Sequence, residues 1–347
     1  MKYGSILTLV LSMCFCTCLL VFPNGGAYGV IDGIKICYSV IIPSLFPFTV
    51  FTLLLFESDA IDFLTKILNP ISSRLFCVNG KIFAVYIMSV IGGYPVGAKL
   101  ISKMLKSNEI STAQARILLG SCVNSAPSYL IVAIGCGIFK NKAIGIVLYA
   151  ACISTSLIIL AITGRFIESK NIIYNKSSRT MSFSDNFVAS TYDSTVSMIN
   201  ICSFIILFSA ILGLAKEVLP QNNITDLLLS LLEITNGVSH ANGNVLFVAF
   251  MSGFAGVCVH LQIFSLCSNV KPSYIQFLLF RITHGILSVV MTYILLKLFH
   301  ITVQTVSFNA DTVIYASKYS ISFGIILVIC AVVFIASIQN LKKGGNL

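Results

Sequence analysis

Gly92-Gly93-Tyr94-Pro95-Val96-Gly97 is the stretch that decides the fold, because it interrupts an apolar run (82–98) that contains no charged residue. Three glycines and one proline in six residues do not continue a regular helix. Proline removes a backbone donor and clashes with the preceding turn, and each glycine costs about 1 kcal/mol relative to alanine. The run therefore predicts a broken or re-entrant membrane helix.

Other apolar runs on both sides of this segment are long enough to cross a membrane, since about 20 apolar residues span the hydrocarbon core. They cover 5–31, 36–56, 117–139, 143–164, 194–215, 234–270 and 319–341, and a further run, 272–299, is interrupted by Arg281 and Lys297. Hydrophobic residues make up 57% of the chain and charged residues 10%, whereas about a quarter of a soluble domain is charged.

Helices are expected in these runs because lipid offers no partners to backbone N–H and C=O groups. The short alternating segments of a membrane β-barrel do not occur. The sequence thus predicts an all-α polytopic integral membrane protein with about eight to ten transmembrane segments, and the lipid bilayer as its surroundings.

The net charge of +10 does not indicate a nucleic-acid partner. The Lys and Arg residues are spread singly over loops and run ends, as they are around membrane spans, and do not cluster as on a nucleic-acid surface.

The most polar stretch, 165–195, is expected to be a cytoplasmic loop. The predicted organisation is a transmembrane helix (1–30), a first half (31–164), this loop, and a second half (196–341) that ends in a C-terminal transmembrane helix.

The two halves resemble each other around the broken segment. Residues 83–116 and 247–281 align with an offset of 163 that becomes 162 after one gap, which pairs Gly93 with Gly256. Interrupted segments at matching positions in two halves point to a binding site at their interface; the alternative for the second half is close helix packing through small residues. Substrate binding is predicted for Gly92, Gly93, Tyr94, Pro95, Gly97 and Gly256.

Two basic side chains lie at membrane depth, where a charge costs about 3 kcal/mol or more. Lys99 follows the broken segment, and Arg281 lies in the middle of its run. Both are predicted to bind substrate. Snorkelling to an interface is the alternative for Lys99, because Lys103 and Lys106 follow it.

Further polar residues lie near these elements. His260, Gln262 and His284 are predicted to be substrate-binding, and so are Asn124 and Ser125, which belong to a second helix-breaking patch. The alternatives for the two histidines are a hydrogen-bonded structural role and the transport of a coupling proton.

Catalytic chemistry has little support in the sequence. His-Glu-x-x-His, P-loop and Gly-x-Ser-x-Gly motifs are absent, so no catalytic residue is predicted and an enzyme is not expected.

Glu233 is the acid best placed to matter in the second half, but we expect it at a helix end on the surface. Most of the 12 Cys lie in apolar runs, where free Cys acts as a small hydrophobe; no metal and no cofactor are predicted.

Five motifs occur in a characteristic order. They are Val40-Ile-Ile-Pro43-Ser44-Leu45-Phe46-Pro47-Phe48, Gly92-Gly93-Tyr94-Pro95-Val-Gly97-Ala98-Lys99, Asn124-Ser125-Ala-Pro127, Gly253-Phe-Ala-Gly256 with His260-Leu-Gln262, and Arg281-Ile-Thr-His284. Over roughly residues 30–300 the chain resembles the sporulation integral membrane protein YlbJ family, which carries a nucleoside recognition or gate domain.

The resemblance implies two gate-like halves and transport of dipicolinic acid, a small aromatic dicarboxylate, from mother cell to forespore across the outer forespore membrane. Lys99 and Arg281 would then face the two carboxylates. The alternatives are a non-transporting sporulation membrane protein that gates or recruits partners, a nucleoside-like solute transporter, and an intramembrane enzyme acting on lipid or envelope precursors. A homo-oligomer and a complex with other sporulation membrane proteins are both open.

Overall fold

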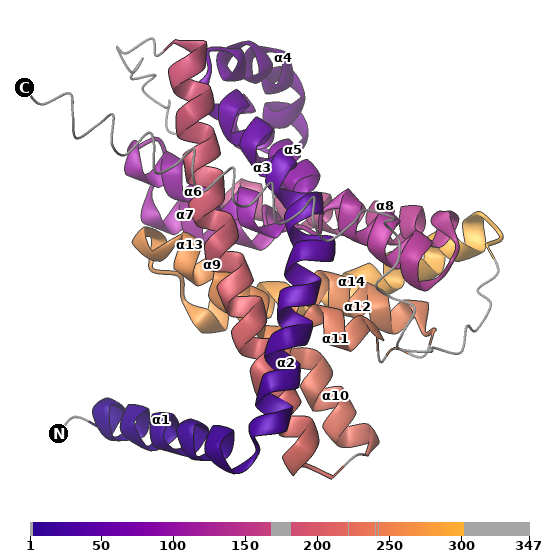
Figure 1. Ribbon diagram of the computed structural model, residues 1–347. Coiled ribbons are helices and arrows are strands. Elements are labelled where there is room, and N and C mark those ends of the chain that lie inside the picture. The colour runs from indigo at the N-terminus through magenta and orange to yellow at the C-terminus, as the bar shows by residue number, and fades with distance from the viewer. Residues whose placement is uncertain (1–2, 168–181, 221, 240, 242, 302–347) are drawn as a thin grey trace, which may run out of the picture.

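The computed structural model describes residues 3–301, except 168–181, 221, 240 and 242. All regular structure in this part of the chain is helical (Figure 1), which confirms the predicted class. The α-helices are α1 (Tyr3–Val21), α2 (Pro23–Ile36), α3 (Ile42–Glu57), α4 (Ala60–Leu75), α5 (Gly80–Gly92), α6 (Tyr94–Lys106), α7 (Thr112–Ser121), α8 (Lys142–Thr163), α9 (Phe183–Val218), α10 (Asn223–Leu232), α11 (Ile234–Ser239), α12 (Val245–Phe254), α13 (Gly256–Leu266) and α14 (Tyr274–Leu298). Two π-helical segments, η1 (Cys37–Ile41) and η2 (Ser128–Ile138), and two 3₁₀ turns, η3 (Gly164–Phe166) and η4 (Ser268–Val270), complete the set.

Five of the described helical stretches are long and apolar enough to cross a membrane: Pro23–Glu57, Lys142–Phe166, Phe183–Val218, Val245–Leu266 and Tyr274–Leu298. A sixth arises if α4 and α5, which meet at 97°, form one span. The count lies below eight to ten because several predicted runs are divided. The first predicted helix bends at Phe22, and 117–139 becomes α7, a non-helical stretch and η2. The predicted span 319–341 lies outside the described residues.

Among the described helices, the most extensive contact is the one between α2 and α9, which lie side by side (Figure 1). Gly25, Gly29 and Gly33, spaced four residues apart, face α9, and a Cβ added at Gly29 would collide with the carbonyl oxygen of Ser209. Small residues allow helix backbones to approach this closely. Because α9 begins at Phe183, residues 183–195 are helical and not part of a loop as predicted.

Two helix breaks occur at the positions that the sequence repeat pairs. Gly93 separates α5 from α6 with φ 85°, and Ala255 and Gly256 separate α12 from α13 with φ 74° and 73°. The next helices also start at paired positions, after the N-caps Ser111 and Ser273. The helix boundaries therefore follow the predicted offset in both halves.

A third irregular stretch, residues 122–126, follows α7 and precedes η2. It passes directly over α6, since a Cβ at Gly97 would collide with the carbonyl oxygen of Cys122. The first helix break and the predicted Asn-Ser-Ala-Pro patch therefore lie side by side. The second helix break lies next to them.

Candidate functional site

The two helix breaks meet at Tyr94. Its hydroxyl donates a hydrogen bond to the Ser252 carbonyl oxygen at 2.6 Å and also contacts the Ser125 hydroxyl. Ser125 donates to the same carbonyl oxygen at 3.2 Å. This carbonyl lies in the last turn of α12, where helical carbonyls lose their intrahelical partners. Tyr94 and Ser125 therefore satisfy a backbone group that the second break releases.

Asn124 connects the end of α7 to α5, the helix that ends at the first break. Its Nδ2 donates to the Ser89 hydroxyl at 3.1 Å and to the Ser121 carbonyl oxygen at 2.9 Å. The side chain is buried, and its Oδ1 has no hydrogen-bond partner among the described residues. The patch thus contacts α5 through Asn124 and the second break through Ser125. The sequence predicted a helix-breaking patch here, and the binding of substrate by its residues stays a prediction.

An open pocket lies where the breaks face α3 and α9, and its empty volume of about 570 Å³ includes space that is open to the surroundings. Gly93, Tyr94 and Pro95 line it from the first half, and Glu233 and Gln262 line it from the second. Most of the remaining wall is apolar, with contributions from η1, α3, α9, α13 and Ala126. A mainly apolar pocket with a few polar groups, drawn from two halves, is typical of small-molecule sites.

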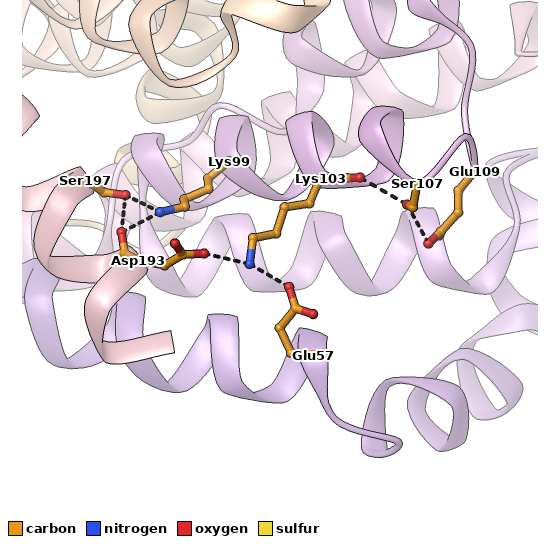
Figure 2. Close-up of polar contacts among 7 residues, drawn as sticks. All are labelled: Glu57, Lys99, Lys103, Ser107, Glu109, Asp193 and Ser197. Atoms are coloured by element: carbon orange, nitrogen blue, oxygen red, sulfur yellow. Dashed lines mark hydrogen bonds and ion pairs between the residues drawn. The ribbon is translucent and has the colours of Figure 1, made fainter. Parts of the chain in front are cut away.

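Lys99 and Lys103 project from α6 toward α9 (Figure 2). Lys99 Nζ donates to the backbone carbonyl oxygen of Asp193 at 2.5 Å and to Ser197 Oγ at 2.6 Å. Lys103 forms ion pairs with Glu57 on α3 at 2.5 Å and with the Asp193 carboxylate at 3.0 Å. The nearby carboxylates therefore pair with Lys103, and the described hydrogen bonds of Lys99 all go to neutral oxygens.

Arg281 is fully buried at 0% exposure. Its Nη1 donates to the Val123 carbonyl oxygen at 2.7 Å, and its Nη2 donates to the Gly120 carbonyl oxygen at 2.8 Å. These carbonyls belong to the end of α7 and the stretch that follows it, where the helix dipole favours a cation. Arg281 thus caps α7 and does not line the pocket, and among the described residues it forms no ion pair.

The two predicted histidines are hydrogen-bonded inside the bundle and fully buried. His284 Nδ1 accepts from Arg281 Nη2 at 2.8 Å, so the ring proton lies on Nε2, which faces the Cys152 carbonyl oxygen at 3.3 Å. His260 Nε2 faces the Phe254 carbonyl oxygen at 2.8 Å. Neither ring lines the pocket. These contacts fit the structural alternative better than proton transport.

Four of the predicted substrate-binding residues line the pocket: Gly93, Tyr94, Pro95 and Gln262. The others are not among its lining residues, namely Gly92, Gly97, Lys99, Asn124, Ser125, Gly256, His260, Arg281 and His284. Their contact with a substrate stays a prediction.

The expectation that Glu233 lies on the surface was wrong. The chain turns between α10 and α11, so that Glu233 is only 3% exposed and lines the pocket. Its Oε1 accepts a hydrogen bond from the Thr235 backbone amide at 3.0 Å. Tyr129 and Ser44 also line the pocket and were not predicted. The uncharged run that continues from Glu233 to residue 270 was the signal that could have placed this acid inside the membrane bundle.

Interrupted helices that meet at a pocket within long apolar helices define a polytopic integral membrane protein. Comparison with known proteins shows a relative: the chain is 25% identical to the sporulation integral membrane protein YlbJ of Bacillus subtilis (strain 168), in an alignment that covers 76% of each chain. The resemblance predicted from the motifs is thereby confirmed. No family model matches the chain, and no solved structure matches it.

Proposed function

We propose that this chain transports a small organic anion across a membrane, with dipicolinate as the first candidate, moved from mother cell to forespore across the outer forespore membrane. The observation that carries the proposal is the pocket at the junction of the two helix breaks. Non-helical backbone at membrane depth is tolerated where it lies within protein or lines a cavity. Paired breaks around a central site are characteristic of transporters built from repeats.

The charges around the first break support an anionic solute. Lys99 and Arg281 donate to carbonyl, hydroxyl and imidazole groups, and no carboxylate forms an ion pair with either among the described residues. Their positive charges therefore add to the potential of the region. The N-terminus of α6, at the pocket residue Tyr94, adds a partial positive charge of the same sign.

The biological assignment rests on similarity. The name of the relative places that protein in sporulation, and the motif resemblance implies dipicolinate. The lining is compatible with an aromatic solute, because Tyr94 and Tyr129 contribute aromatic rings to a largely apolar wall.

Uptake of labelled dipicolinate into liposomes that contain the purified full-length protein tests the proposal. We expect saturable uptake that protein-free liposomes lack. Lys99→Met should lower it, whereas Lys81→Met, which removes an ion pair with Glu109 at 2.8 Å, should not. Excess unlabelled nucleoside serves as competitor, since competition would favour the nucleoside-like alternative. Correctly folded protein that takes up no dipicolinate would refute the proposal.

A further inference from the structure

The two helix breaks differ in the residues that adopt the left-handed backbone. The first break has a glycine in this conformation, Gly93, and Pro95 follows it in the first turn of α6. Proline has no N–H to donate to the preceding turn, so α5 and α6 cannot join into one regular helix. The second break begins with an alanine, Ala255 at φ 74°, and no proline occurs in Val245–Leu266. The sequence therefore requires the first break and only permits the second.

The backbone at Ala255 favours a continuous helix over a broken one. A left-handed residue with a Cβ is less stable than a right-handed one by an amount that shifts a two-state balance about five- to thirty-fold. In a continuous helix the carbonyl oxygens of Ser252 and Phe254 would also accept hydrogen bonds from the amides four residues later. Local preferences alone would therefore close this break.

Three side chains bind the carbonyl groups at the second break and hold it open. Tyr94 on α6 and Ser125 donate to the Ser252 carbonyl oxygen at 2.6 and 3.2 Å. His260 Nε2 lies 2.8 Å from the Phe254 carbonyl oxygen, and it carries the ring proton because a carbonyl oxygen only accepts. These bonds replace those of a continuous helix. Tertiary contacts therefore oppose the local preference, as expected of an element with two accessible conformations.

The two helices at this break need little reorientation to join. They form one apolar stretch of 22 residues, Val245–Leu266, whereas α4 and α5 meet at 97°. As a continuous helix this stretch would be about 33 Å long, enough to cross a hydrocarbon core of about 30 Å. A Cβ added at Gly253 would lie only 2.7 Å from the Cα of Gly285, so α12 packs closely against α14. The helix that moves is therefore α13.

We propose that α12 and α13 form a two-state element, broken in this structure and continuous in a second conformation, which converts once in each transport cycle. The link to transport rests on the proposed function, whereas the conversion itself does not. Val259 and Gln262 on α13 line the pocket. Backbone changes at Ala255 and Gly256 turn α13 relative to α12 and carry these residues away from their present positions. The broken form thus binds the solute and the continuous form releases it.

Two substitutions shift the balance in opposite directions. Ala255→Gly removes the strain and should favour the broken form about five-fold or more, whereas Gly256→Ala adds a second strained residue to that form, because Gly256 has φ 73°. In dipicolinate uptake by liposomes, we expect Ala255→Gly to lower the maximal rate several-fold without raising KM. Gly256→Ala should raise KM, since apparent affinity falls with the fraction of the binding form. The variant with both substitutions should lie between them.

Hydrogen–deuterium exchange of the full-length protein in lipid nanodiscs measures the conversion without transport. In the broken form the amides of residues 256–259 belong to the first turn of α13 and lack intrahelical acceptors, which the continuous form supplies. Exchange at 256–259, followed by mass spectrometry, should be several-fold faster in Ala255→Gly than in the wild type and slower in Gly256→Ala. Gly137→Ala is the matched control and should exchange and transport as the wild type does, because a Cβ at Gly137 meets only a carbonyl oxygen at 3.5 Å.

Tyr94→Phe tests the tertiary contacts and leaves the backbone of the break unchanged. It keeps the aromatic ring in the pocket and removes the hydroxyl that binds Ser252, so exchange at 256–259 should slow. Tyr149→Phe is its control, because the Tyr149 hydroxyl binds the Val90 carbonyl oxygen at 3.2 Å, away from the second break.

The outcomes separate this proposal from the proposed function. Equal exchange at 256–259 in the wild type, Ala255→Gly, Gly256→Ala and Tyr94→Phe would overturn the two-state element, whatever the uptake. Shifted exchange with wild-type uptake kinetics in all variants would overturn its role in transport. Folded wild-type protein that takes up no dipicolinate would overturn the proposed function, and the exchange measurement would still decide whether the helix converts.

Discussion

Gly93→Ala tests whether the first helix break requires glycine. At φ 85° and ψ −174°, Gly93 has a backbone conformation that is essentially restricted to glycine, and other residues there cost about 1–3 kcal/mol. The added Cβ would also lie 3.0 Å from the Cβ of Ala126, on the stretch that carries the pocket wall. Crowding of this kind costs about 1 kcal/mol or more. We therefore expect the free energy of unfolding to fall by about 2–4 kcal/mol.

Thermal unfolding in detergent, followed with a thiol-reactive fluorogenic dye, measures this effect. The chain has no tryptophan, but Cys122, Cys152 and Cys267 are buried and become reactive on unfolding. A slope of about 2–4 °C per kcal/mol predicts a midpoint lowered by at least about 4 °C.

Gly137→Ala is the control for this substitution. A Cβ at Gly137 would meet only the Val132 carbonyl oxygen, at 3.5 Å, so its midpoint should stay close to that of the wild type. A Gly93→Ala midpoint equal to that of Gly137→Ala would refute the claim that this break requires glycine.

Three further predictions can be checked in the same assay. Ala255→Gly should stabilise the protein by about 1 kcal/mol, because Ala255 holds φ 74°, where alanine is strained; a lower midpoint would contradict this. Lys103→Met should cost about 0.5–2 kcal/mol through the loss of two partly exposed ion pairs, and Lys35→Met, whose pair with Asp32 is more exposed, should cost less; equal effects would count against the reasoning. Arg281→Lys should cost about 2–3 kcal/mol, since one ammonium does not reproduce the guanidinium contacts with two carbonyl oxygens and a histidine; wild-type stability would contradict it.

The helix breaks could be predicted because their causes are local. Glycine at a position that needs positive φ and proline in the first turn of the next helix are visible in the residues themselves. The second break shows the limit of this rule. Its first residue with positive φ is Ala255, which no local preference selects, and only the paired position of Gly256 indicated it. The division of 117–139 into α7, a non-helical stretch and η2 was likewise missed as a boundary, although its Asn-Ser-Ala-Pro patch was recognised.

The partners of the polar side chains could not be predicted in the same way. Arg281 was expected to face a substrate, but its two carbonyl acceptors lie 158 and 161 residues earlier in the chain. Lys99 was expected at an interface or at a ligand, and its partners lie on α9, 94 and 98 residues away. Such contacts depend on how helices pack, and hydropathy carries no information about which buried polar groups meet.

The sequence by itself determined that the chain is a helical membrane protein, where its apolar runs lie, and that one of them is broken at Gly93. These properties follow from transfer of apolar residues to lipid and from the backbone preferences of glycine and proline, which act within a few residues. The tertiary structure alone decided that Tyr94 joins the two breaks and that Glu233 lines the pocket between them. A pocket exists only when distant segments have packed together, and the same packing buries an acid that its neighbours in sequence would leave at a helix end.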